Sequence, residues 1–208
     1  FKTGNSIYIK QHDATVKAIR QQLNTLKKLE NQRQDEINTQ IYFLERHLTN
    51  YNKNFRKMVA LTRQLGFKDY GIIGETREHI HAVENTSYPY DFSQMLMLRR
   101  HEKDFLLRKQ EQYVKKHQRA AKELIASIEA KSHNPAEKKE LISHVKAYKK
   151  GFKKMVALHK RIGYTPYSGL QGDVNEQYTR MELRISRVQK LVHGYIEGTE
   201  KKVSSFFL

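Results

Sequence analysis

The feature that most constrains the fold is a segment that occurs twice in the chain. Residues 51–66, YNKNFRKMVALTRQLG, are echoed by residues 148–163, YKKGFKKMVALHKRIG, with the Tyr, the Phe, the run MVAL and the final Gly at the same spacing. After one inserted residue, GIIGETRE at 71–78 is matched by GLQGDVNE at 169–176. In each copy we expect a helix ended by a left-handed Gly, a short loop and a new helix. The repeat predicts two related helical modules.

Few residues in the chain break a helix. Only 3 Pro and 10 Gly occur among 208 residues, which is too few for the many turns of an all-β protein. Charged residues make up 29% of the chain and the mean hydropathy is −0.80, values that suit the large surface of thin helical bundles. The lack of cysteine excludes disulfides, thiolate metal sites and cysteine nucleophiles. We therefore expect an all-α fold.

Breaks between helices are predicted from Gly, Pro and capping residues. Pro135 suits the first turn of a helix, and Asp91 is a suitable N-cap. Residues 5–65 contain neither Gly nor Pro, and we predict a break there at Thr49-Asn50. The expected helices are 5–47, 51–66, 72–87, 91–132, 136–163 and 171–207.

The lengths of these helices predict how they pack. At ~1.5 Å per residue the first and fourth helices are equally long, so each can run through two bundles. We therefore expect six helices in two stacked antiparallel four-helix bundles that share these two long helices. One module would comprise about 5–31 and 107–207, and the other about 32–106.

The charge balance restricts the partners without choosing one. The chain has 39 Lys and Arg against 22 Asp and Glu, a net charge of +17. This permits nucleic acid, anionic membrane surfaces or acidic small molecules as partners. No apolar run of about 18 residues and no signal peptide is visible. Because the chain begins FKTG without an initiator Met, we expect it to be a fragment of a larger protein.

Six consecutive polar or titratable residues, RRHEKD at 99–104, interrupt the apolar stripe of the expected helix 91–132. Some of them must face the core, because a hexapeptide does not fit on one side of a helix. Charges that face the core need partners or a ligand.

The segment MLMLRRHEKDFLLR at 95–108 resembles the central signature of the helical bimodular sensor domains of methyl-accepting chemotaxis receptors. The repeated YxxxF and GxxG segments resemble the same family, and the resemblance covers essentially the whole chain. It implies that residues 1–208 are a soluble periplasmic sensor domain of an inner-membrane receptor, with 5–31 plus 107–207 as the membrane-proximal module and 32–106 as the distal one. It also implies a homodimer, small organic acids as ligands, and a cytoplasmic signalling region.

The candidate residues for holding an organic anion are Lys17, Arg20, Arg33, Arg108, His117 and Arg180. Lys17 and Arg20 lie one helical turn apart, so both could bind one carboxylate. It is equally consistent with the sequence that both are ordinary cations on a solvent-exposed face of the helix. Arg108 closes the signature and is expected level with the junction of the bundles.

The other three candidates have ordinary structural alternatives. Arg33 lies on the apolar stripe of the first expected helix, where an ion pair between helices is the favoured role. His117 lies in the stripe of the fourth, where a hydrogen-bonded core histidine is favoured. Arg180 begins an edge row that a plain charged face would explain equally well.

No pattern in the chain predicts catalysis. HExxH, Walker A and GxGxxG motifs do not occur, and no Ser-His-Asp or Cys-His arrangement is recognisable. We expect no enzymatic activity, no cofactor and no metal. Two alternatives to a chemoreceptor are the sensor domain of a histidine kinase and a basic helical scaffold for membrane surfaces or nucleic acid. The aromatic residues lie at core spacing and are not interleaved with exposed Lys and Arg, so no nucleic-acid partner is expected.

Overall fold

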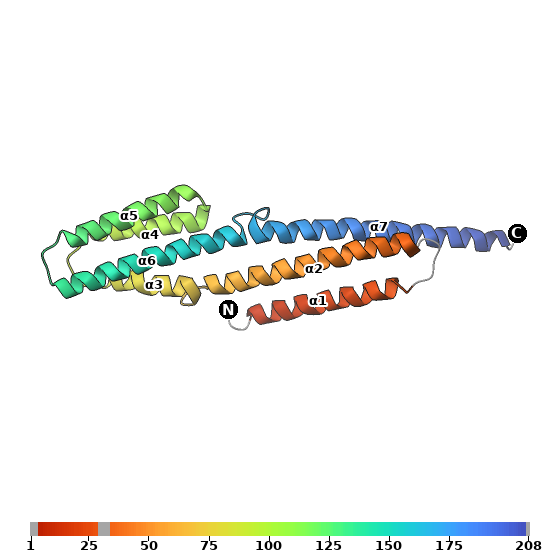
Figure 1. The fold of residues 1–208 in the computed structure, drawn as a ribbon, viewed down its shortest axis with the longest axis horizontal. Helices are drawn as coiled ribbons and strands as arrows, with labels where there is room; N and C mark the ends of the chain where they lie inside the picture. Colours follow the sequence, from red (N-terminus) through yellow and green to blue (C-terminus); the bar gives the residue numbers. More distant parts are fainter. Residues whose placement is uncertain (1–3, 29–33, 207–208) are drawn as a thin grey trace. The chain divides into compact units, whose positions relative to one another are not determined.

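The structure is a computed structural model that describes residues 4–28 and 34–206. Over these residues it is all-helical, which confirms the predicted all-α class (Figure 1). The described helices are α1 (Gly4–Leu26), α2 (Gln34–Leu65), α3 (Gly71–Glu84), α4 (Phe92–Arg108), α5 (Glu111–Glu129), α6 (Pro135–Ile162) and α7 (Gly169–Phe206).

Contacts between the helices divide the chain into two compact units. The first unit comprises residues 1–58 and 165–208, and the second unit comprises residues 59–164. The boundaries of the units therefore differ from those of the expected modules, near residues 31 and 107. Two unexpected helix ends, described below, account for this difference.

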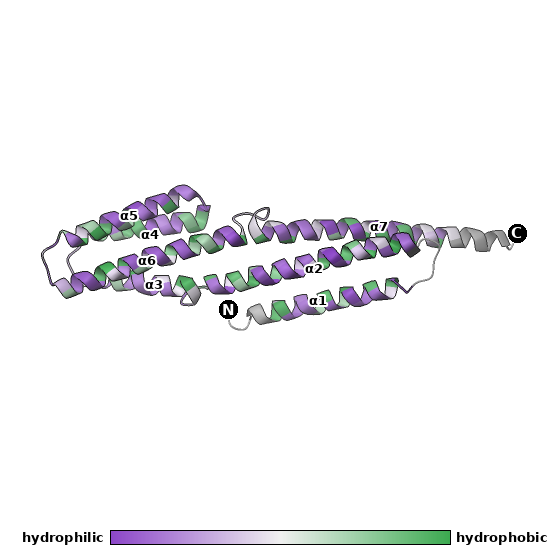
Figure 2. Cartoon of the chain, viewed as in Figure 1, coloured by the Kyte–Doolittle hydropathy of each residue, from purple (hydrophilic) through white to green (hydrophobic). Residues whose placement is uncertain are grey.

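The second unit contains a four-helix bundle in which consecutive helices are antiparallel (Figure 1). α3 packs on α6, α6 on α5, α5 on α4, and α4 on α3. Hydrophobic and hydrophilic residues alternate along each helix, as expected of amphipathic helices around a core (Figure 2). All four helices contribute buried apolar side chains to this core: Ile80, Val83, Met95, Leu98, Ala121, Leu124, Ile128, Val145 and Tyr148.

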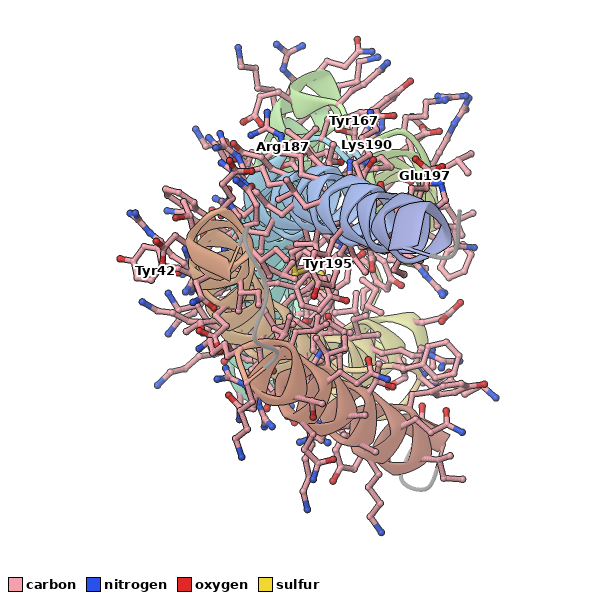
Figure 3. All side chains as sticks on the ribbon, turned by 90° about the vertical axis from the view of Figure 1, so that its right-hand side faces the viewer. Tyr42, Tyr167, Arg187, Lys190, Tyr195 and Glu197 are labelled. Atoms are coloured by element: carbon pink, nitrogen blue, oxygen red, sulfur yellow. The ribbon has the colours of Figure 1, made fainter. Side chains whose placement is uncertain are left out.

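The first unit is built from α1, α7 and most of α2. Arg184 Nη1 on α7 donates a hydrogen bond to Gln40 Oε1 on α2 at 3.0 Å. In Figure 3, Tyr195 lies on the side of α7 that faces α1 and α2, whereas Arg187 and Lys190 lie on its outer side. The apolar core of this unit comes from all three helices: Ile19, Leu23 and Leu26 of α1, Ile37, Ile41 and Leu44 of α2, and Met181, Leu191 and Val192 of α7.

The predicted break at Thr49-Asn50 is wrong, because α2 runs through it to Leu65. Leu44 and Leu48 are buried on one face of α2, and this burial outweighs the weak helix propensity of Thr and Asn. The preceding helix ends much earlier, at Leu26, where Lys27 and Lys28 form a turn. The expected helix 5–47 therefore corresponds to α1 and the first part of α2.

The predicted single helix 91–132 is also wrong, because α4 ends at Arg108. Lys109 has a left-handed backbone, with φ 53° and ψ 33°, and its N–H donates to the carbonyl oxygen of Phe105 at 2.7 Å. Gln110 is extended, and α5 then folds back against α4. A left-handed residue with a side chain costs ~1–2 kcal/mol, so no sequence signal marks this end.

Two other predicted helix starts are confirmed by their capping hydrogen bonds. Asp91 Oδ1 accepts a bond from the backbone N–H of Ser93 at 3.0 Å, ahead of α4. Asn134 Oδ1 accepts one from the N–H of Ala136 at 2.9 Å, and α6 begins at Pro135. Both helices thus begin at a side-chain oxygen that satisfies a free backbone donor.

The repeat in the sequence is also a repeat of backbone geometry. The first helix of each copy ends at a glycine with positive φ, +83° at Gly66 and +121° at Gly163, so the predicted glycine ends are confirmed. With ψ 137°, however, Gly163 does not adopt the predicted left-handed helical conformation. A Cβ at Gly74 would lie 2.5 Å from the carbonyl oxygen of Asp69, and one at Gly172 would lie 2.8 Å from that of Tyr167. In both copies, therefore, the loop packs directly against the first turn of the following helix.

Candidate ligand-binding cleft

The polar segment 99–104 places one carboxylate inside the second unit, as its interruption of the apolar stripe predicted. Glu102 of α4 accepts a hydrogen bond from the hydroxyl of Tyr148 of α6. Burial raises the pKa of Glu102, and this hydrogen bond opposes the shift. Arg99 Nη1 lies 2.8 Å from Glu84 Oε2 in a half-buried ion pair with α3. The charges that turn inward on α4 therefore have partners on neighbouring helices.

On another face of α4 a cleft of about 310 Å³ opens between α4 and α5. Gln94, Met97 and His101 recur three to four residues apart, so they form one row along α4. Lys116, Arg119 and Glu123 form a matching row along α5. The complete lining is Ser93, Gln94, Met97, His101, Lys116, Arg119, Ala120 and Glu123.

The cleft combines exposed cations with buried polar atoms. Lys116 and Arg119 are exposed at its mouth, with Glu123 as the single acidic residue of the lining. His101 Nδ1 and Gln94 Oε1 are buried and have no hydrogen-bond partner among the residues that the structure describes. Burial lowers the pKa of His101, and the nearby Lys116 lowers it further. The imidazole is therefore neutral at pH 7 and can donate one hydrogen bond.

These groups together suit a small carboxylate. A guanidinium and an ammonium can each hold a carboxylate oxygen, and the guanidinium can do so through two parallel hydrogen bonds. The amide of Gln94 can present either its oxygen or its NH₂ group, since the two ends have nearly the same shape. The cleft thus offers up to four donor groups to an anion, from Lys116, Arg119, His101 and Gln94.

His117 of α5 lies behind this cleft in the core, and its predicted core position is confirmed. Its side chain is 0% exposed and its ring stacks on that of Phe152, with the centroids 3.8 Å apart. The expected hydrogen bond is wrong: neither ring nitrogen has a partner among the described residues. Burial, with smaller contributions from His101 and Lys149, lowers its pKa from 6.5 to about 3.

The other predicted site residues of the second and first units have ordinary surface partners. Arg108 Nη1 lies 3.0 Å from Asp104 Oδ1 and donates a hydrogen bond to the hydroxyl of Tyr113. Arg180 Nη2 lies 2.6 Å from Glu176 Oε1, again one turn away on the same helix. Both arginines are about half exposed, so these ion pairs contribute little to stability.

The remaining candidates lie on or near α1. Arg20 Nη2 donates a hydrogen bond to Thr49 Oγ1 of α2 at 3.2 Å, and Lys17 is exposed one turn before it. Arg33 lies outside the described residues. Lys17, Arg20 and Arg180 thus belong to the first unit, and Arg108 and His117 to the second. A shared anion pocket of Arg108 with Lys17, Arg20 and Arg180 stays a prediction.

Sequence reasoning missed the residues that line the cleft. His101 lies within the polar interruption that drew attention to α4, but nothing distinguished it from its five neighbours. No sequence pattern singles out Lys116 and Arg119, which lie inside the single helix expected over 91–132. The α4–α5 hairpin that brings the two rows together is a tertiary feature without a local signal.

In the described part of the chain, no group of three or more His, Asp or Glu could hold a metal ion. Two histidines, His79 of α3 and His144 of α6, do meet, with their Nδ1 atoms 3.2 Å apart. None of the helices in residues 4–28 and 34–206 is both long and apolar enough to cross a membrane.

Comparisons with known proteins found no matching family model, no similar curated protein and no similar solved structure.

Proposed function

We propose that this chain is the extracytoplasmic sensor domain of a transmembrane receptor and binds a small organic anion in the α4–α5 cleft. The observation that carries the proposal is the cleft itself, where Lys116 and Arg119 stand beside the buried His101 and Gln94. The proposal includes what the resemblance implies: a chemotaxis receptor as the parent protein, a periplasmic location, a homodimer and two stacked helical bundles.

The chemistry of the cleft favours a carboxylate over neutral or cationic ligands. Lys116 and Arg119 supply two positive charges against the one negative charge of Glu123. The buried His101 Nδ1 and the buried end of the Gln94 amide have already lost their water. A carboxylate recovers free energy by accepting a hydrogen bond from the protonated Nδ1 of His101, and from the NH₂ group of Gln94 once the amide is turned to present it. A cation would meet Lys116 and Arg119 at the mouth and be repelled.

A ligand held by both rows would change how α4 and α5 pack. The two helices are joined only by the left-handed Lys109 and the extended Gln110, so an anion that draws the two rows together changes the angle between the helices about this tight turn. A ligand shifts a conformational equilibrium by its difference in affinity for the two states. We propose that closing of the α4–α5 hairpin on the anion is the first step of signalling.

Titration calorimetry with succinate tests the proposal, with succinamide as the uncharged control of the same shape. Succinate is expected to bind and succinamide not to bind measurably. The variants Lys116→Met and Arg119→Met are each expected to weaken succinate binding by about 10-fold or more. Lys122→Met is the matched control, because Lys122 is an exposed lysine of α5 that does not line the cleft.

The same titration followed by NMR reports on His101. A bound anion stabilises the imidazolium, so it is expected to raise the lowered pKa of His101. Equal losses of succinate affinity in Lys116→Met, Arg119→Met and Lys122→Met would indicate diffuse attraction to the net charge of +17 and would refute the proposed site. Binding of DNA or anionic vesicles with equal dependence on all three residues, and no carboxylate binding, would favour the basic scaffold instead.

A further inference from the structure

The repeat allows one helix contact to be compared in the two units. In the second unit, α6 and α3 touch where Gly151 meets Thr76: a Cβ at Gly151 would lie 2.1 Å from Thr76 Oγ1. Only glycine therefore permits this approach. The side chains around the contact fill the space between the helices, and all are at most 2% exposed: Thr76, Ile80, Tyr148 and Met155.

The corresponding contact in the first unit is between α2 and α7. There Asn54 occupies the position of Gly151, and Val174 occupies that of Thr76. Because Asn54 carries a Cβ and an amide, α2 and α7 cannot approach as closely as α6 and α3 do. Tyr51, Met58 and Tyr178 take the places of Tyr148, Met155 and Ile80.

The result is an open cleft of about 270 Å³ where the second unit has packed side chains. Its lining comes from α2, from α7 and from the loop before α7: Tyr51, Met58, Pro166, Gln171, Val174, Asn175 and Tyr178. Every residue of this lining belongs to the first unit.

The lining determines which ligands fit. It contains no charged side chain, so a buried ionic group would have no counter-charge. The rings of Tyr51 and Tyr178 and the side chains of Met58 and Val174 offer an apolar surface suited to a flat ring. The amides of Gln171 and Asn175 can each donate and accept a hydrogen bond.

We propose that this cleft is a second ligand site, which takes an uncharged aromatic compound bearing an amide or hydroxyl group. It differs in chemistry from the cationic α4–α5 cleft and does not depend on it. The chain would then sense two classes of compound, one in each unit.

Benzamide and benzoate are the probes, because they share size and shape and differ in charge. We expect benzamide to shift the NMR signals of residues around Val174 with a Kd on the order of 1 mM, and benzoate to bind there at least about 10-fold more weakly. Val174→Phe fills the cleft and is expected to weaken benzamide binding at least about 10-fold. Ile185→Phe, an exposed position of α7 outside the cleft, is the matched control.

Two milder variants keep the test independent of folding. Asn175→Ala and Gln171→Ala change exposed side chains and are each expected to weaken benzamide binding several-fold. Benzoate shifting the signals around Val174 as strongly as benzamide would overturn the proposal. So would unchanged benzamide affinity in Val174→Phe and Asn175→Ala. Succinate binding is measured in the wild type and in the same variants. Its absence in the wild type would refute the anion site alone. Unchanged succinate binding beside weakened benzamide binding would confine the effect to the second site, and loss of succinate binding in these variants would contradict the independence of the two sites.

Discussion

The imidazole of His117 stacks on Phe152 with ring centroids 3.8 Å apart, and His12 stacks on Phe55 in the same way at 3.9 Å. Phe55 and Phe152 are equivalent positions of the repeat. The repeat therefore extends to the helix that packs against each copy, where a histidine stacks on this phenylalanine, and the matched segments of the sequence do not show this. Inward positions of α1 and α5 also share their spacing: His12, Val16, Ile19 and Leu23 against His117, Ala121, Leu124 and Ile128. Each unit therefore contains a related helical hairpin, α1–α2 or α5–α6.

Replacing His117 with Phe is expected to remove part of the acid sensitivity of the fold. The folded state lowers the pKa of His117 from 6.5 to about 3, so the unfolded chain binds this proton more tightly. The contribution of the neutral His117 to the free energy of unfolding is therefore fully present above pH 6.5 and is lost as the pH falls toward 3. Between pH 7.5 and 5 the loss due to His117 is about 2 kcal/mol, measured by chemical denaturation.

The control for this prediction is His193→Gln, at an exposed position of α7. It is expected to leave the pH dependence of the unfolding free energy unchanged. A His117→Phe variant with the same slope as the wild type would show that His117 titrates normally in the folded protein.

Gly151→Ala is expected to destabilise the second unit, although alanine is normally the better helix residue. The new Cβ would collide with Thr76 Oγ1, and such overpacking typically costs ~1–3 kcal/mol. Adding Thr76→Ala removes the colliding atom and should restore part of the loss. Gly198→Ala, where a Cβ meets nothing within 4 Å, is expected to stabilise α7 by up to ~1 kcal/mol. Thermal unfolding of these variants measures each change, and a neutral Gly151→Ala would contradict the close contact.

The hydrogen bond from Tyr148 to Glu102 is expected to couple the two residues energetically. Tyr148→Phe leaves a buried carboxylate without its donor, at a cost of ~1.5–3 kcal/mol. In the background of Glu102→Gln the same change should cost at least ~0.5 kcal/mol less, as a double-mutant cycle would measure. Strictly additive effects would mean that the two groups do not interact.

The contribution of Glu102 to the free energy of unfolding depends on pH with the opposite sign to that of His117. Because burial raises the pKa of Glu102, its proton is bound more tightly in the folded state. Its contribution to stability is present at low pH and is lost as the pH rises through the raised pKa. Glu102→Gln should therefore gain stability relative to the wild type as the pH rises from 4 to 7.

Lys109→Gly is expected to stabilise the turn between α4 and α5 relative to Lys109→Ala by about 1 kcal/mol. Both variants remove the ammonium group that lies 5.5 Å from the Phe105 ring, but only glycine relieves the left-handed backbone. Both should also raise the pKa of His159, which burial and then Lys109 lower to about 4. Equal stability of the two variants would argue against a left-handed residue 109.

The sequence predicted those parts of the fold that depend on local chemistry. Asp91, Asn134 and the glycines at 66 and 163 mark helix ends by their own conformational preferences, and the structure has helix ends there. The end of α4 was missed because Lys109 adopts a conformation that its side chain disfavours. The break at Thr49-Asn50 was wrong because burial of the neighbouring Leu48 dominates weak local propensities.

The candidate cleft could be predicted only in part, for the same reason. A run of six polar residues in an apolar stripe indicated where α4 would need partners, and Glu102 has one. Which residues near Glu102 line a cleft depends on α5, the helix that folds back against α4. The pairing of His101 with Lys116 and Arg119 therefore requires tertiary structure.

The helix partners also set the order in which the protein can be completed during its synthesis. α7 follows α6 in the chain but contributes to the core of α1 and α2, whereas α3 follows α2 and packs on α6. Ile41 therefore leaves the ribosome well before Met181, which packs against the same apolar cluster. At ~5–20 residues per second, the nascent hairpin α1–α2 has an unfilled apolar groove for roughly 7–30 s. The second unit, by contrast, is complete once residue 164 has been made, so all of its core residues are available before those of the first unit.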